Sequence, residues 1–421
     1  MTATAPADSF LTANPHALGL ILQASETRAI IASRDIFDIS GIKLWARDQP
    51  VSQALQRKLL DRQLRNPLET CLMAEGGVTP TSMVDATEAL LASGTPLAGL
   101  LRPHAARLII EAKNLPLQPV AQLLLSVGQT ARPESFDHSV QAMALAGAMM
   151  ITHGGTTAEV RLAMLGGLLH DIGEMYIDPR FGEFDADWSL DFVSYQQLVV
   201  HPHVGHLLLT QLTQYPAALA RGVAEHHERL DGSGYPHALR RDALSPLGRL
   251  LAVAEAALNT LRQDPGNLAR ASVALRVVPG EFDMDWVTEV AKAATIQGPP
   301  EDGLDLVVVQ LRLERLDDAL RRAQDHATAL ESRSEPGTLR ETLVLAQFLI
   351  GRLRAGWFAS GLWSGAAVTS QDAAEVEAIE DELFFRLRAI ERAALLRAGE
   401  LPEVDAASLS VLCEALRASG I

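Results

Sequence analysis

HHERLDGSGYP, at residues 226–236, joins two adjacent histidines to a glycine-rich turn. Further upstream, LLHDIGE at residues 168–174 places a histidine next to an aspartate. Imidazole nitrogens and carboxylates without cysteine sulfur form a ligand mix that borderline and hard transition metals accept. The two stretches together therefore predict a metal site. The glycines of the turn allow its backbone to wrap closely against the ligands.

The histidines of the chain are concentrated around these two stretches. Eight of the twelve lie between His138 and His227. His138 follows Glu134 by four positions, and Pro133 suits the first turn of a helix, so both side chains are expected on one helical face. This pair is a candidate chelate.

The His170-Asp171 pair closes the apolar run LAMLGGLL, which predicts a helix that ends near Gly173. Neighbouring residues on a helix point about 100° apart. The aspartate can therefore bridge two metals while the histidine binds one.

The composition favours helices. Apolar residues make up 48% of the chain and are mainly alanine and leucine, whereas aromatic residues make up 5%. We therefore expect a mostly α protein. The exception lies at residues 34–49, where two short apolar stretches flank Ser40-Gly41 as in a β-hairpin. A helix is expected from Ser52, carrying the leucines at positions 55, 59, 60 and 64.

Four parts are expected along the chain. They are a small amino-terminal module with the hairpin at 1–80, a helical connector at 81–114, the metal-binding domain at 115–262 and a helical carboxy-terminal domain at 263–421. In the last part, apolar residues alternate by three and four as a heptad seam, at Leu306, Val309, Leu313, Leu316, Leu320, Ala323 and Ala327. The seam either joins two subunits in a homodimer or packs inside its own bundle.

Charge and cysteine content narrow the class of protein further. The net charge of −16 repels phosphate polymers, so we expect no nucleic-acid polymer as a partner. Only Cys71 and Cys413 are present, which fits a reducing compartment. No basic residue precedes Arg28 and no stretch approaches the ~18 apolar residues of a membrane span, so we expect a cytoplasmic protein without membrane association.

HDxG followed by HHExxDGxGYP resembles the HD-GYP family of bacterial metal-dependent phosphodiesterases, whose members hydrolyse the second messenger cyclic di-GMP. The resemblance covers roughly residues 115–262 and implies an all-helical HD-domain core. It also implies hydrolysis by a hydroxide that bridges metal ions, with His170 and Asp171 as the catalytic centre. The ligand set that it implies is Glu134, His138, His170, Asp171, His201, His226, His227 and Glu255.

Eight donors exceed what one ion can bind, so two or three metals are expected. The absence of cysteine from the set favours iron or manganese over zinc. The resemblance also implies that Gly234, Tyr235 and Pro236 of the turn line the substrate site.

Two positions depart from the family's pattern. Glu174 stands where the family has a lysine that meets a substrate phosphate, and a carboxylate there would repel that phosphate. Glu255 stands where the family usually has an aspartate. Because only four of the 36 basic residues are lysines, arginines are expected to replace the missing lysine. The candidates are Arg229, Arg240, Arg241 and Arg249, of which the last is at the family's own arginine position.

Three other interpretations remain open. The first is a sensor or adaptor that binds cyclic di-GMP or a diguanylate cyclase but hydrolyses slowly or not at all, and Glu174 is its best argument. The second is a phosphohydrolase of the HD superfamily that acts on another nucleotide. The third is a purely structural helical protein, for which the metal-ligand pattern would be a coincidence.

Overall fold

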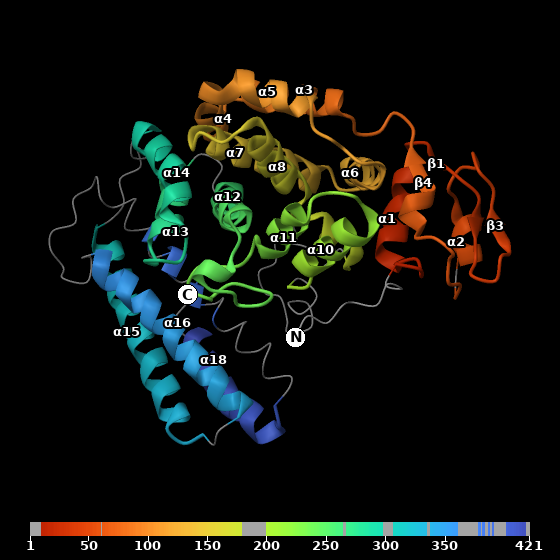
Figure 1. Ribbon diagram of the computed structural model, residues 1–421. Helices are drawn as coiled ribbons and strands as arrows, with labels where there is room; N and C mark the ends of the chain where they lie inside the picture. Colours follow the sequence, from red (N-terminus) through yellow and green to blue (C-terminus); the bar gives the residue numbers. More distant parts are fainter. Residues whose placement is uncertain are drawn as a thin grey trace.

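The computed structural model describes residues 10–59, 61–178, 199–263, 267–297, 306–334, 337–360, several residues between 378 and 390, and 401–417. These residues are mostly helical, as expected, and the strands among them are short. Figure 1 shows the strands at one end, a layered helical core in the middle and long carboxy-terminal helices at the other end.

Two small antiparallel pairs form the amino-terminal module after helix α1 (Pro15–Ser25). One pair is the expected hairpin, which turns at Gly41 with a positive φ of 86°. The helix expected from Ser52 ends at Leu59, so Leu64 lies beyond it and is buried beside the hairpin. The strands and this helix are β1 (Ile30–Ala32) with β4 (Leu72–Ala74), β2 (Ile36–Phe37) with β3 (Lys43–Trp45), and α2 (Gln53–Leu59).

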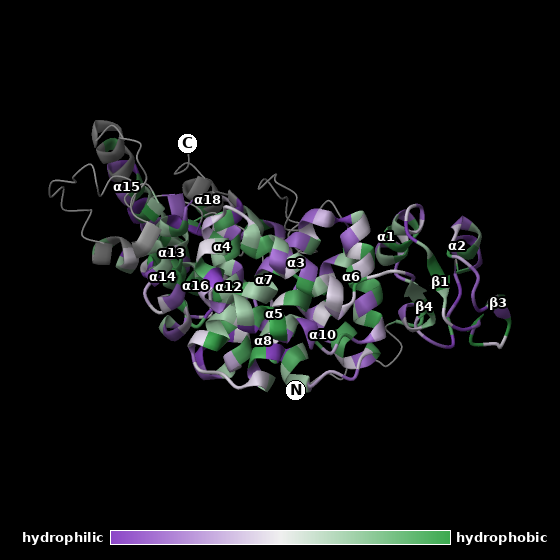
Figure 2. Ribbon diagram, turned by 90° about the horizontal axis from the view of Figure 1, so that it is seen from above, coloured by the Kyte–Doolittle hydropathy of each residue, from purple (hydrophilic) through white to green (hydrophobic). Residues whose placement is uncertain are grey.

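Two long helices, α7 (Pro133–Thr152) and α8 (Thr157–Leu169), lie side by side in the centre. They approach closely because Gly167 has no side chain. A Cβ atom at this position would lie only 2.3 Å from the Ala142 carbonyl oxygen. Figure 2 shows hydrophobic residues along these central helices. The neighbouring helices are α3 (Pro80–Ala92), α4 (Pro96–Leu101), η2 (Arg102–His104), α5 (Ala105–Lys113) and α6 (Pro119–Ala131).

A second group of helices closes the core on the other side of α8. Helix α12 packs against α7, α8 and α11, so side chains from distant parts of the sequence meet between them. The elements are η3 (Ile172–Tyr176), α10 (His201–Leu212), α11 (Ala217–Glu225), η5 (Arg241–Ala243) and α12 (Pro246–Gln263).

The carboxy-terminal helices build a separate hydrophobic core. Leu316, Leu320, Ala323 and Ala327 of the heptad seam are buried in it, where α15 packs against α16 and α18. This part of the seam therefore packs inside its own chain. The side chains at 306, 309 and 313 lie outside the described residues, and a homodimer through them stays a prediction. The helices of this core are α15 (Leu306–Glu331), α16 (Thr338–Ser360) and α18 (Glu403–Arg417), with part of α13 (Leu268–Arg276). Helix α14 (Met284–Gln297) packs into the central core instead, against α4, α7 and α12.

Among all described helices, none has both the length and the apolar character that a membrane crossing requires.

Candidate metal centre

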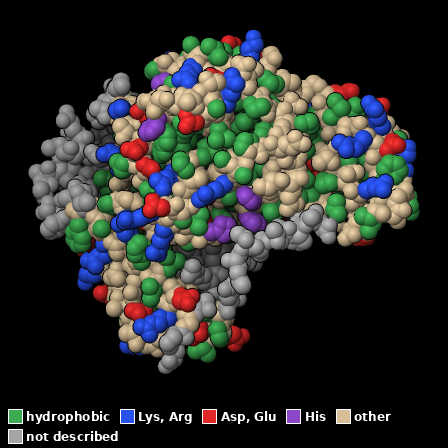
Figure 3. All heavy atoms as spheres, viewed as in Figure 1, with side chains coloured by type: hydrophobic (Ala, Val, Ile, Leu, Met, Phe, Trp, Pro, Cys, Tyr) green, Lys and Arg blue, Asp and Glu red, His purple; other side chains and the backbone are tan. Residues whose placement is uncertain are grey.

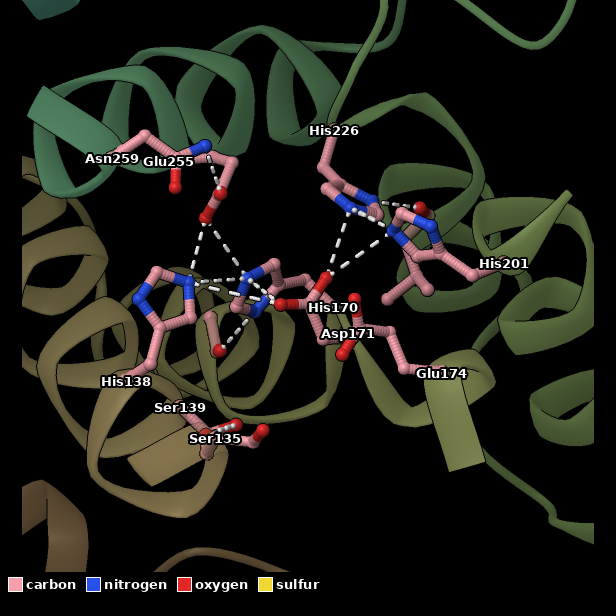
Figure 4. A network of polar contacts seen from close by, with 12 residues as sticks. Ser135, His138, Ser139, His170, Asp171, Glu174, His201, His226, Glu255 and Asn259 are labelled. Carbon is pink, nitrogen blue, oxygen red and sulfur yellow. Dashed lines mark hydrogen bonds and ion pairs between the residues drawn. The ribbon is translucent and has the colours of Figure 1, made fainter. Parts of the chain in front are cut away.

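The structure brings seven of the eight expected donors together in two buried groups that share Asp171. They come from the interiors of α7 and α12 and from the ends of α8, α10 and α11 (Figure 4). The first group is His138, His170, Asp171 and Glu255, and the second is Asp171, His201, His226 and His227.

The first group is centred on one oxygen of Glu255. Its Oε2 atom lies 2.9 Å from His138 Nε2 and 3.0 Å from His170 Nε2, and the two nitrogens are 3.2 Å apart. Asp171 Oδ2 lies 3.1 Å from His170 Nε2. Four donor atoms from three regions of the sequence therefore converge on one small volume.

The second group uses the other oxygen of the same aspartate. Asp171 Oδ1 lies 3.3 Å from His201 Nε2 and 3.3 Å from His226 Nε2. These two nitrogens are 3.1 Å apart, and His227 completes the group. Asp171 thus offers one carboxylate oxygen to each group, which is the geometry of a bridging ligand.

Backbone carbonyls fix the tautomers of two histidines. His170 Nδ1 lies 2.7 Å from the Gly167 carbonyl oxygen, and His226 Nδ1 lies 2.6 Å from that of Val223. A carbonyl oxygen only accepts, so both Nδ1 atoms carry the donated proton. In the neutral rings, the lone pair is then on Nε2 and faces the other donors, as in metal-bound histidines.

The donor set fits a divalent cation. Both Asp171 oxygens are buried and accept no hydrogen bond from the described residues. They face imidazole nitrogens at 3.1–3.7 Å. The lone pairs of these oxygens and nitrogens therefore repel one another unless a cation lies between them. A bound metal satisfies these atoms together.

The protonation states agree with this arrangement. Burial alone would raise the pKa of Asp171, but its histidine neighbours hold that pKa well below its usual value. Burial also opposes ionisation of Glu255, whose pKa is nevertheless held low by His138 and His170. Burial and the neighbouring His227 lower the pKa of His226 to about 3. Charged carboxylates and a neutral imidazole are the forms that ligate metal.

His170 behaves differently because two carboxylates surround it. Burial lowers its pKa, but Asp171 and Glu255 outweigh burial and raise that pKa well above 6.5. In the metal-free protein, a proton on His170 therefore separates the carboxylates. A metal ion held by His170 would displace this proton, because a histidine binds metal through an unprotonated nitrogen.

Gly173, the glycine of the HDxG pattern, positions His201. A Cβ atom at Gly173 would lie 2.0 Å from the His201 carbonyl oxygen and 2.7 Å from the Gly205 backbone nitrogen. Only glycine allows the start of α10 to lie so close to η3. The local sequence therefore places the His201 side chain against Asp171.

The glycine-rich turn supports His227. The Tyr235 ring stacks on the His227 ring with centroids 4.5 Å apart, and the Tyr235 amide donates to the His227 carbonyl oxygen at 3.1 Å. A Cβ atom at Gly234 would lie 2.4 Å from that oxygen, and the Tyr235-Pro236 peptide bond is cis. The substrate contacts expected for these three residues stay a prediction.

Glu134 is not part of either group, contrary to the ligand set expected from the sequence. It lies in the first turn of α7 and its side chain is exposed to solvent. Its charge raises the pKa of Asp137 in addition to the larger effect of partial burial there. The spacing of four residues from His138 correctly suggested one helix, but the helix begins too close to the surface for Glu134 to face inward.

Glu174 is buried and lies beside Asp171 (Figure 4). It belongs to neither group of donors. Its Oε2 atom lies 3.9 Å from Arg132 Nη1, from the residue that precedes α7. The carboxylate that replaces the family's lysine is therefore accompanied by an arginine from another part of the chain.

Three of the arginines expected to bind phosphate have protein partners. Arg229 forms an ion pair with Glu281 at 3.4 Å, and the Arg240 guanidinium lies over the Phe348 ring at 5.1 Å. Arg249 donates to the Arg241 carbonyl oxygen at 2.9 Å. These contacts direct the guanidinium groups toward neighbouring protein segments. Figure 3 shows basic side chains (Lys or Arg) beside histidine side chains on the face that it draws.

Two supporting residues were missed from the sequence. Asn259 donates to Glu255 Oε1 at 2.6 Å and so fixes the orientation of that carboxylate. Its position one helical turn after Glu255 was a usable signal. Glu228 accepts from the backbone amides of His237 at 2.7 Å and Leu239 at 2.9 Å and so shapes the turn. Nothing in the sequence distinguished this structural carboxylate from a ligand.

Residues 87–278 match the family model of the HD domain. This part of the chain is therefore an HD domain, and the resemblance to HD-GYP proteins expected from the sequence is confirmed. The matched residues include all seven of the histidine, aspartate and glutamate donors that the structure brings together.

Among particular proteins, the chain is similar to the cyclic di-GMP phosphodiesterase PA4108 of Pseudomonas aeruginosa, with 30% identity over 52% of this chain and 50% of that protein. It is 32% identical to the cyclic di-GMP phosphodiesterase response regulator RpfG of Xanthomonas campestris over 24% of this chain and 27% of that protein. It is also 32% identical to the 3'3'-cGAMP-specific phosphodiesterase 3 of Vibrio cholerae over 21% of this chain and 18% of that protein. The chain spans half or less of the length of these relatives.

A structural comparison finds Bd1817, described as a HDG"Y"P protein from Bdellovibrio bacteriovorus. The match has a TM-score of 0.36 and 18% identity and covers 52% of this chain and 70% of that chain.

Proposed function

We propose that this protein is a cytoplasmic phosphodiesterase that hydrolyses cyclic di-GMP with two metal ions, iron or manganese, in the two buried groups. The observation that carries the proposal is the shared aspartate, because one buried carboxylate with an oxygen in each group is what a binuclear site requires. Two bound ions supply Lewis acidity toward the phosphodiester and lower the pKa of water.

The protein side chains have separate roles in this proposal. His138, His170 and Glu255 hold one ion, and His201, His226 and His227 hold the other, with Asp171 common to both. The Gly167 and Val223 carbonyls keep two imidazoles in the ligating tautomer. Burial excludes bulk water, which strengthens each charge interaction in the site.

Cyclic di-GMP is favoured as the substrate because two of the relatives reported above carry that activity in their names. The relative named for 3'3'-cGAMP makes this dinucleotide the second candidate. Arg132 and Arg241 are the arginines that we assign to the substrate side. They have to act locally, since the net charge of −16 opposes an anionic substrate.

A catalytically weak sensor is the alternative function, and Glu174 supports it. A carboxylate beside Asp171 adds negative charge where a substrate phosphate approaches. Such a protein would bind the dinucleotide and a partner, such as a diguanylate cyclase, without rapid turnover.

The test combines metal analysis with hydrolysis assays on one preparation. Protein produced with iron or manganese is expected to contain two ions per chain and to hydrolyse cyclic di-GMP faster than 3'3'-cGAMP. Asp171→Asn is expected to lose most of the metal and the activity, whereas Glu134→Gln, an exposed position on the same helix as His138, should keep both.

Each result has a defined meaning. Fewer than one ion per chain would contradict the binuclear centre. Two ions with binding of cyclic di-GMP, but turnover no higher than that of Asp171→Asn, would replace the enzyme with the sensor. Faster hydrolysis of 3'3'-cGAMP would reassign the substrate.

A further inference from the structure

The segment that carries His226 and His227 is held by residues outside the HD motifs, namely the loop between α13 and α14 and the carboxy-terminal helices. Arg229, two residues after His227, pairs with Glu281 in the loop between α13 and α14. Asp231 lies 3.8 Å from Arg352 of α16. These contacts connect the ligand segment to residues far along the chain.

Glu281 is the centre of this connection. Its side chain is buried and contacts two guanidinium groups, those of Arg229 and Arg386. Its backbone carbonyl accepts from the Leu230 amide at 2.8 Å. The Phe282 ring lies under both guanidinium groups, with Arg229 at 4.7 Å and Arg386 at 5.8 Å.

This arrangement leaves little freedom to Arg229. Its side chain is largely buried, and its Nη1 atom also donates to the Glu228 carbonyl oxygen at 3.0 Å. A buried cation without its counter-charge is strongly unfavourable, so loss of Glu281 forces Arg229 to move or to admit water. Either response displaces the backbone next to His227.

We propose that Glu281 is a positioning residue that acts through Arg229 to hold His226 and His227, and so makes the second metal group depend on the carboxy-terminal helices. The inference rests on the proposed binuclear centre. It adds that a carboxylate outside the HD motifs, Glu281, fixes the position of the segment that follows His227. The first group, built by α7, α8 and α12, has no contact with Glu281 among the described residues.

The test uses the full chain with Glu281→Gln and the matched control Asp381→Asn. Asp381 also ties the carboxy-terminal region to the HD side, but its ion-pair partner at 2.9 Å is Arg270 of α13 rather than Arg229. Binding of Mn²⁺ and amide hydrogen exchange in the metal-free protein are measured for both variants and the wild type.

Glu281→Gln is expected to retain the first ion and to bind the second at least tenfold more weakly. In this variant the Leu230 and Tyr235 amide hydrogens should exchange at least tenfold faster than in the wild type. Amides in α7 and α8 should be unchanged, which a general loss of stability would not produce. Asp381→Asn should resemble the wild type in both measurements. If Glu281→Gln does not fold, Glu281→Asp, which keeps the charge but shortens its reach, gives the same comparison with a smaller effect.

Wild-type metal affinity and wild-type exchange of the Leu230 and Tyr235 amides in Glu281→Gln would overturn the inference, as would equal effects of Asp381→Asn. These outcomes leave the proposed hydrolysis untouched. If the wild type bound no metal, the proposed function would fail, and the exchange data would still decide whether Glu281 holds the ligand segment.

Discussion

Glu174 and Arg132 form a largely buried ion pair beside Asp171, which explains how a carboxylate is tolerated where the family has a lysine. The exposed fractions of the two side chains are only 3% and 16%, so each charge has little access to water. Mutations of Glu174 and Arg132 should therefore have non-additive effects on the free energy of unfolding.

Glu174→Lys alone is expected to destabilise the protein. It replaces an attraction with a repulsion at a buried site, and breaking such pairs costs roughly 3–5 kcal/mol. Chemical denaturation should show this loss. The double variant Arg132→Gln with Glu174→Lys should recover most of the stability, because one cation then remains. A stable single variant with raised hydrolysis would show that the pair is unimportant.

The buried contact between Glu69 and Tyr176 joins the amino-terminal module to the end of the HDIGEMY segment. The Tyr176 hydroxyl donates to Glu69 Oε1 at 2.6 Å. Burial raises the pKa of Glu69 above 4.5, and the hydrogen bond from Tyr176 offsets this only in part. The folded state therefore holds the proton more tightly than the unfolded state does.

This raised pKa predicts the pH dependence of stability at Glu69. The contribution of protonated Glu69 to the free energy of unfolding is complete below pH 4.5, and it declines as the pH rises from there through the raised pKa. Glu69→Gln retains an acceptor for the Tyr176 hydroxyl but does not titrate. Its free energy of unfolding, relative to wild type, should rise with pH above 4.5 in urea titrations. A difference that stays constant with pH would contradict this.

Several donors of the metal centre lie at the ends of helices. His170, His201 and His226 stand where α8 ends, where α10 begins and where α11 ends, so small shifts of these helices move the ligands. Glycines at the crossings remove the side chains that would keep the helices apart. The carboxy-terminal helices, in contrast, pack through an ordinary hydrophobic seam.

Leu320→Ala tests that seam. Leu320 is fully buried in the core formed by α15, α16 and α18, and a Leu→Ala change in such a core costs about 2–5 kcal/mol. Leu311→Ala on the same helix is the control, because Leu311 is 50% exposed and should change stability by less than about 0.5 kcal/mol. Chemical denaturation measures both. Equal effects would mean that the seam packs differently.

The molecule as a whole should be stabilised by metal, since the seven donors span residues 138 to 255 and the unfolded chain cannot bring them together. At a free metal concentration of 100 times Kd, one site contributes about 2.7 kcal/mol. Adding a chelator to the metal-loaded protein should therefore lower Tm by roughly 5–10 °C.

The control for this measurement is Asp171→Asn, which should show a low Tm with or without chelator. Exposed Glu134→Gln should behave as the wild type. A wild-type Tm that does not respond to chelator after confirmed removal of metal would contradict a metal-linked fold.

The amino-acid sequence by itself determined the helical class, the hairpin and the HD-domain resemblance. It also identified seven donors that the structure brings together. The family resemblance supplied His138, His201 and Glu255, whereas HDxG and HHExxDGxGYP hold the other four at short spacings within continuous segments. Such spacings follow from local backbone geometry.

Only the tertiary structure decided which residues face inward and what each charge meets. Glu134 lies on the surface because α7 begins there, and Arg229 is held by Glu281, more than fifty positions away in the sequence. Leu316 and Leu320 pack within their own chain, although their heptad spacing is equally typical of a dimer. Periodicity specifies a face of a helix but not its partner, since burial and ion pairing depend on segments that only the packed molecule brings together.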